Sequence, residues 1–403
     1  MEARGVTAER PGTRIPAWLA GLVPLLVLGV AIAAFVALDA PGLERNGVPV
    51  EKLSVERTEL HPGEIELTVR NDGPDPVSVV QAIVNDGFAD FSQTSDEIGR
   101  LGASTVRVQY PWLEGEAYEM ALLTSTGGTV NASIDVAAET PDADLGFFGL
   151  MALVGLYVGV IPVAIGMLWL PWIRRIDPRY VQFLLALTLG LLAFLGIDAL
   201  LEGTEFAGEG SQAFGGAALV YLGAGMAYLA LVAVDGRLRG SEEKAKSKGI
   251  APWRLAFLVA LGIGLHNLGE GLAIGSSYAI GSLALGATLI IGFALHNTTE
   301  GLAIVAPVAK GDSAPRGNLR RFVGLGLLAG LPAVLGAWIG ASAFNPSLAA
   351  FMFGLGAGAI AQVIVQIAPS IRDSAGRLLH PLAVAGVVSG LVLMYATGLL
   401  ISL

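Results

Sequence analysis

Two stretches of this sequence repeat each other: "LHNLGEGLAIGSS" at residues 265–277 and "LHNTTEGLAIVAP" at residues 295–307. Each places a His, an Asn and a Glu, in that order, inside a strongly apolar run. In the middle of a membrane span, an unpaired charged side chain costs at least about 2.5–3.5 kcal/mol. Such residues therefore need a physical reason, and the rest of the chain shows what kind of protein they lie in.

The composition is that of a membrane protein. Of 403 residues, 54% are hydrophobic and 14% are charged, and the mean hydropathy is +0.66. A helix that crosses a hydrocarbon core of about 30 Å needs roughly 20 apolar residues. We therefore predict a polytopic α-helical membrane protein, with spans at about 16–39, 146–172, 180–201, 213–234, 252–278, 280–308, 322–343, 347–369 and 380–402. The chain has no Cys, which excludes disulfides and thiolate ligands.

One segment, residues 41–145, has a different pattern. It holds 19 acidic and 6 basic residues. Short runs such as "GEIELTVRNDGPDPVSVV" alternate apolar and polar residues and are separated by turn residues. This pattern predicts a small all-β, immunoglobulin-like sandwich. The predicted domains are a leader at 1–15, an uncleaved transmembrane anchor at 16–40, the β domain at 41–145, and a membrane domain of eight helices at 146–403.

Lys and Arg in the loops predict the orientation. If the N-terminus is cytoplasmic, every cytoplasmic loop contains Lys or Arg and the short outer loops contain none, as the positive-inside rule requires. The cytoplasmic loops are then "RRIDPR", "DGRLRGSEEKAKSKGIAPWR", "KGDSAPRGNLRR" and "RDSAGR". We therefore expect a multi-pass protein of the cell membrane with the β domain and the C-terminus outside.

The spacing inside the repeat suits a metal site. His266 and Glu270 are four residues apart, as are His296 and Glu300, so each pair lies on one helix face. Asn267 and Asn297 flank those faces. Imidazole, amide and carboxylate groups are ligands of divalent transition metals, and two neighbouring antiparallel helices would bring both sets to a similar depth.

A packing role is the alternative explanation for each of these residues, because a buried His or Asn often only hydrogen-bonds between helices. Two observations favour ligands instead. Of the four His in the chain, two fall at matching positions of the repeat, and the neighbouring spans offer no Lys or Arg to pair with the two Glu. A bound cation is the simplest compensation for those charges.

With "HNLGEG" in the fourth of the last eight spans and "HNTTEG" in the fifth, residues 146–402 resemble the ZIP (Zrt/Irt-like) divalent metal transporters, in particular the GufA-like branch. The resemblance implies import of Zn²⁺, Fe²⁺ or Mn²⁺ into the cytosol, zinc first, as cargo and not as a cofactor. The implied transport-site ligands are His266, Asn267, Glu270, His296, Asn297 and Glu300.

Three features depart from the family pattern. Gly269 and Thr299 stand where a Pro often precedes each Glu and kinks the helix. Ala333 stands where some members have a Glu that bridges two metals. The first span and the β domain are additions to the family core.

Other polar residues in the spans are weaker candidates for the ion pathway. Asp198 and Glu202 could attract cations at an outer entrance, and Gln362 and Gln366, one turn apart, could line the exit; interfacial and packing roles are the alternatives. We expect no enzyme activity and no nucleic-acid partner, and the sequence permits a homodimer. The rival functions are an intramembrane metal-dependent hydrolase and a metal sensor that uses the β domain, for which no partner can be named.

Overall fold

The computed structural model describes residues 17–38, 50–134, 136–142, 144–245, 251–279, 283–309, 319–343, 345–373 and 375–401. The chain divides into two compact units, Met1–Pro49 and Val50–Leu403. The predicted leader at 1–15 lies outside the described residues.

The first unit contains one helix, α1 (Ala17–Ala37), which has no charged residue. Its described side chains between Leu22 and Phe35 are exposed, and most of them are large and apolar. A helix with no polar side has no face that prefers water. The helix lies within the stretch predicted as an anchor, and its apolar part, Leu22–Phe35, is shorter than the six candidate membrane spans described below.

The second unit begins with two antiparallel sheets of four strands each, ordered β1-β2-β6-β5 and β4-β3-β7-β8. The alternation read from the sequence recurs in the burial of these strands: in β2, every second side chain from Ile65 to Asn71 is buried. The strands are β1 (Leu53–His61), β2 (Glu64–Asn71), β3 (Val79–Val84), β4 (Gly87–Ala89), β5 (Phe91–Gln93), β6 (Ala103–Gln109), β7 (Tyr118–Thr124) and β8 (Thr129–Ile134).

The two sheets share one hydrophobic core. Leu67 of β2 and Val106 of β6 belong to the same buried cluster as Ala82 of β3 and Leu122 of β7. On the first sheet, Arg70 Nε lies 2.6 Å from Glu56 Oε1, and this hydrogen bond raises the pKa of the Arg70 guanidinium. The β region thus buries its own apolar faces, as predicted for residues 41–145.

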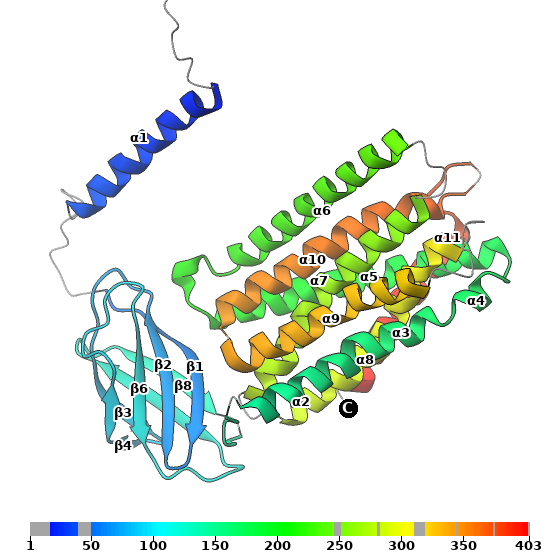
Figure 1. The fold of residues 1–403 in the computed structure, drawn as a ribbon. Coiled ribbons are helices and arrows are strands. Elements are labelled where there is room, and N and C mark those ends of the chain that lie inside the picture. The colour runs from blue at the N-terminus through cyan, green and yellow to red at the C-terminus, as the bar shows by residue number, and fades with distance from the viewer. Residues whose placement is uncertain are drawn as a thin grey trace, which may run out of the picture. The chain divides into compact units, whose positions relative to one another are not determined.

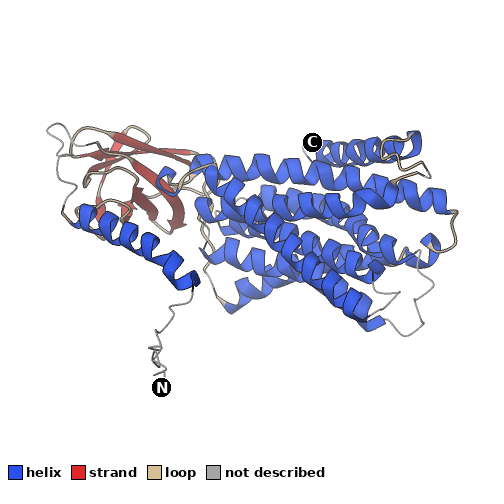
Figure 2. Cartoon of the chain, turned by 90° about the horizontal axis from the view of Figure 1, so that it is seen from above, coloured by secondary structure: helices blue, strands red, loops and turns tan. Residues whose placement is uncertain are grey.

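Helices make up the rest of the unit and run alongside one another in both ribbon views (Figures 1 and 2). Asp144 begins the first of them by accepting a hydrogen bond from the Phe147 N–H. The helices are α2 (Leu145–Gly155), the π-helical turn η1 (Leu156–Val160), α3 (Ile161–Met167), α4 (Leu170–Ile173), α5 (Pro178–Glu209), η2 (Gln212–Phe214), α6 (Ala218–Ala245), α7 (Ala251–Ala279), α8 (Leu283–Ala309), α9 (Leu319–Ala343), α10 (Pro346–Ile367), η3 (Ala368–Ile371) and α11 (Pro381–Ile401).

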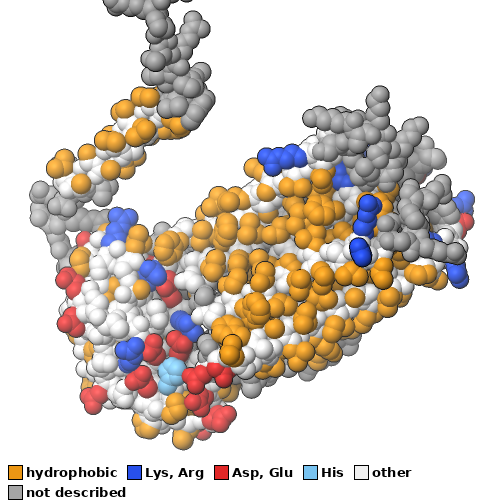
Figure 3. All heavy atoms as spheres, viewed as in Figure 1, with side chains coloured by type: hydrophobic (Ala, Val, Ile, Leu, Met, Phe, Trp, Pro, Cys, Tyr) orange, Lys and Arg blue, Asp and Glu red, His pale blue; other side chains and the backbone are white. Residues whose placement is uncertain are grey.

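Six segments of the described chain are long and apolar enough to cross a membrane: Leu145–Ile173, Arg179–Gly208, Ala218–Gly240, Pro252–Tyr278, Leu319–Ser342 and Pro346–Ile371. Each coincides with one of the nine predicted spans. The other three predicted spans correspond to helices α1, α8 and α11. Hydrophobic side chains cover the face of the helical region in view, and Lys and Arg gather toward one end of the helices (Figure 3).

Glycines let the helices approach at backbone distance. At the crossing of α3 with α8, a Cβ on Gly166 would lie 1.9 Å from the Thr298 carbonyl oxygen. At the crossing of α7 with α9, a Cβ on Gly271 would lie 2.0 Å from the Ala333 carbonyl oxygen. Both helices that carry the repeated motif are therefore held against a neighbour beside the motif itself.

Candidate metal centre

The two motifs lie on unbroken helices. α7 runs through Gly269 and α8 through Thr299, so neither departure from the Pro of the family pattern interrupts its helix. The Thr299 hydroxyl donates a hydrogen bond of 2.6 Å to the His296 carbonyl oxygen one turn earlier. The motif side chains on each helix therefore keep the helical spacing on which the prediction depended.

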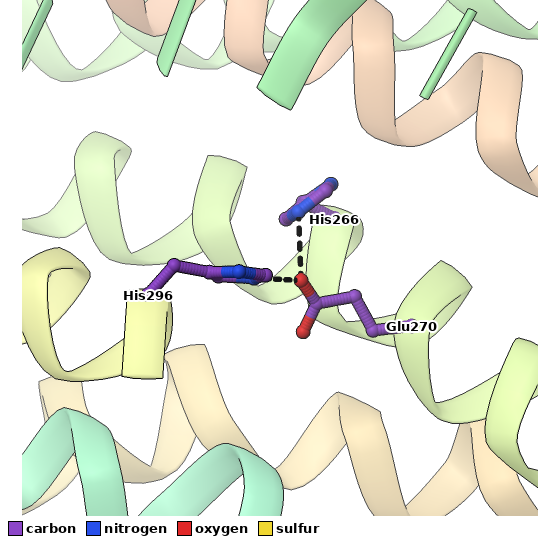
Figure 4. Close-up of side chains that lie close together, drawn as sticks. All are labelled: His266, Glu270 and His296. Carbon is purple, nitrogen blue, oxygen red and sulfur yellow. Dashed lines mark hydrogen bonds and ion pairs between the residues drawn. The ribbon is translucent and has the colours of Figure 1, made fainter. Parts of the chain in front are cut away.

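Three of the six predicted ligands come together. His266 and Glu270 project from α7 and His296 from α8, and all three side chains are buried (Figure 4). His266 Nε2 lies 3.0 Å from Glu270 Oε1, and His296 Nε2 is hydrogen-bonded to the same oxygen. One ligand atom from each residue lies within 4.8 Å of the other two.

This arrangement suits a small divalent ion. Zn²⁺ binds imidazole nitrogen and carboxylate oxygen at about 2.0–2.2 Å with tetrahedral geometry, which separates ligand atoms by about 3.3 Å. The distance from His266 Nε2 to Glu270 Oε1 is 3.0 Å. His266 and Glu270 would therefore need to separate only by a few tenths of an ångström to bind the same ion.

Asn297 is oriented by two hydrogen bonds from its amide nitrogen. Its Nδ2 donates to Glu270 Oε2 at 2.9 Å and to the Val158 carbonyl oxygen, in the π-helical turn η1, at 3.2 Å. The Asn297 Oδ1 atom is buried and has no hydrogen-bond partner in the part of the chain that the structure describes. The amide thus positions the Glu270 carboxylate while keeping an oxygen available.

Asn267 is held in the same manner from the opposite side. Its Nδ2 donates a 3.0 Å hydrogen bond to the Ala329 carbonyl oxygen of α9, and its buried Oδ1 has no hydrogen-bond partner among the described residues. Both carboxylate oxygens of Glu300 are also buried, and by distance and angle neither is hydrogen-bonded to another described residue, although the Asn267 side chain lies close to them. Buried oxygens of this kind are costly unless something pairs with them. Together they form a set of acceptors suited to a cation.

Within the described chain, no ion pair joins Glu270 or Glu300 to a Lys or Arg; the contacts of Glu270 are His266, His296 and Asn297. The negative charge of these buried carboxylates must therefore be compensated by the imidazoles or by an added cation. The close cluster contains His266, Glu270 and His296, and the structure does not include Glu300 in it.

The weaker candidates fall into two groups. Asp198 is exposed and Glu202 half-buried on α5, and both lie close enough to His266 and Glu270 to interact with them electrostatically. Gln362 is buried on α10, and no described residue hydrogen-bonds its Oε1. Gln366, one turn further along, lines a cavity of about 420 Å³ near the end of the bundle.

Sequence reasoning missed the backbone contacts of the site. The Val158 and Ala329 carbonyl groups fix the two Asn amides, yet both residues are apolar and carry no side-chain signal. "LYVGVIP", with a Pro two residues after the π-helical turn, is the only local hint that the ladder of α-helical hydrogen bonds changes there.

Comparisons with known proteins add little to this geometry. Neither the family models nor the curated proteins gave a match. Among solved structures, the archaellum periplasmic stator protein FlaG from Sulfolobus acidocaldarius aligns with 14% sequence identity and a TM-score of 0.19, over 21% of this chain and 100% of that chain. A likeness this low describes a small part of the chain and carries no argument about its function.

Proposed function

We propose that this protein is a membrane transporter that moves divalent transition-metal ions into the cytosol through a site formed by His266, Glu270 and His296. Zinc is the first choice of cargo, with iron or manganese as alternatives, since imidazole and carboxylate ligands accept all three. Asn267, Asn297 and Glu300 would complete the site through their unpartnered oxygens.

One observation carries the proposal: two imidazole nitrogens and a carboxylate oxygen, supplied by both copies of a sequence repeat, meet in a buried place on adjacent helices. A dication there would compensate the buried carboxylate charges. The motif resemblance to the ZIP family supports the same reading and suggests the direction of transport, inward to the cytosol.

A metal-dependent hydrolase would use similar ligands differently. Such an enzyme keeps an open metal position for water and places a separate general base beside it. The other polar side chains of the repeat carry amide and carboxylate groups, which can also act as metal ligands; these are Asn267, Asn297 and Glu300. Duplicated ligands favour binding and release of the ion over activation of a water molecule.

Uptake into liposomes would test the proposal and separate it from this rival. Purified protein is reconstituted with a metal indicator inside, and Zn²⁺, Fe²⁺ and Mn²⁺ are added outside in turn. We expect saturable uptake of at least one ion and no metal-dependent hydrolysis of lipid or peptide substrates. Hydrolysis without uptake would show that the rival is correct.

The proposed orientation makes a separate prediction. Because the chain has no native Cys, Asn131→Cys and Arg377→Cys each introduce a single thiol, both at positions outside the predicted spans. In intact cells, a membrane-impermeant maleimide should label position 131 and leave position 377 unlabelled until the membrane is permeabilised. The opposite labelling pattern would place the β domain in the cytoplasm and reverse the topology.

A further inference from the structure

A cavity of about 420 Å³ opens among the helices at the end of the bundle where α5 and α7 begin and α8 and α10 end. This volume lies in the range of small-molecule sites, about 300–1,000 Å³. The described residues that line it are Leu185, Arg239, Pro252, Arg254, Leu255, Pro307, Gln366, Pro369 and Ser370.

The polar groups around this cavity can all donate hydrogen bonds, and its described lining has two guanidinium groups and no carboxylate. Arg254 is mostly buried, whereas the Arg239 side chain is 59% exposed. Both contact the same carboxylate behind them, Asp235, at 3.3 Å and 2.8 Å.

Two further donors belong to neighbouring elements. Gln366 Nε2 on α10 is buried and has no hydrogen-bond partner among the described residues. Ser370, in η3 beside the end of α10, adds a hydroxyl group to the lining. Guanidinium, amide and hydroxyl groups together match an acceptor with several oxygens, and the guanidinium groups favour one that carries negative charge.

Apolar side chains make up the rest of the described lining. Leu185, Leu255 and Pro307 lie in the lining together with the donors, and an apolar surrounding strengthens charge-assisted hydrogen bonds. Planar guanidinium groups match phosphate oxygens in particular. We propose that this cavity binds a phosphate group, independently of the metal site and of the transport function.

Two sources of phosphate share this chemistry, namely the headgroup of an anionic phospholipid and soluble phosphate. To separate them, the full-length protein is placed in phosphatidylcholine nanodiscs and titrated with inorganic phosphate by calorimetry. In parallel, phosphatidylglycerol is added to the discs and its retention is measured by native mass spectrometry. Saturable binding of either probe supports the proposal and identifies the source.

Arg239→Gln is the main variant, because it leaves the contact between Arg254 and Asp235 in place. Gln366→Leu removes the unpartnered donor from a different helix, and Arg239→Lys keeps the charge but loses the planar fork. The control is Arg377→Gln: Arg377 pairs with Asp373 at the same i,i+4 spacing and 2.8 Å as Arg239 with Asp235, but does not line the cavity.

We expect binding of the active probe to weaken about tenfold in Arg239→Gln and in Gln366→Leu, the loss typical of one charge-assisted hydrogen bond. Arg239→Lys should fall between these variants and the wild type, and Arg377→Gln should bind as the wild type does. If Gln366→Leu does not fold, the comparison of the Arg239 variants with Arg377→Gln decides whether the cavity binds phosphate. Absence of saturable binding for both probes, or equal weakening in the control, would overturn the proposal.

Discussion

Glu270→Gln is expected to lower the affinity for Zn²⁺ at least about 100-fold and to abolish metal uptake. Loss of an outer-shell partner of a metal ligand already costs 10–100-fold in affinity, and Glu270 is itself a proposed ligand. Its carboxylate contacts both imidazoles and the Asn297 amide, so it holds the centre of the cluster. Calorimetric titration with zinc and liposome uptake would measure the two effects.

The matched control is Glu205→Gln, which makes the same change on an exposed side chain of α5 outside the cluster. It should bind and transport zinc as the wild type does. Glu300→Gln should also weaken binding, since it removes the charge of two buried oxygens that have no hydrogen-bond partner among the described residues. If these carboxylates served packing alone, Gln would be tolerated or stabilising. Unchanged zinc affinity in Glu270→Gln would therefore rule out the proposed site.

Gly166→Ala is expected to have the second large effect. The added Cβ would lie 1.9 Å from the Thr298 carbonyl oxygen, and a backbone atom cannot move aside as a flexible side chain can. α3 must then shift away from α8, the helix that carries His296. Overpacking of this kind destabilises proteins by about 1–3 kcal/mol. We expect a lower thermal unfolding midpoint in detergent and weaker zinc binding in the fraction that remains folded.

The control for this variant is Gly149→Ala in α2, because a Cβ on Gly149 would meet no atom within 4 Å. Its unfolding midpoint should stay the same or rise slightly, since Ala favours the helix over Gly. Equal destabilisation by both substitutions would mean that the contact between α3 and α8 has no special role.

The fold was predictable where a single periodicity dominates. Uninterrupted apolar runs predicted the positions of the helices. The alternation around Ile65 predicted a strand in which every second side chain is buried. The π-helical turn at Leu156–Val160 was not predictable, because it depends on tertiary contacts. Gly159 and Gly330 pack so closely there that a Cβ on Gly159 would lie 2.3 Å from the Gly330 carbonyl oxygen.

The side chains of the candidate site were predictable from the sequence, whereas the backbone groups that orient them were not. The i,i+4 spacing put His266 and Glu270 on one helix face, and the repeat pointed to His296 as their partner from the next helix. The prediction of six converging ligands stays a prediction for Asn267, Asn297 and Glu300. Their amides and carboxylate are arranged by carbonyl groups on other helices, and a pattern within one helix contains no information about those neighbours.

X-ray absorption at the zinc edge, on tag-free protein loaded with one equivalent of Zn²⁺, tests most directly whether the repeated motif holds the ion. We expect scattering from two imidazole rings, with nitrogen and oxygen atoms at about 2.0–2.2 Å. The number of rings should fall from two to one in His266→Asn. Zinc bound in a shell of oxygen alone, or two rings persisting in His266→Asn, would show that His266 and His296 do not bind the ion together.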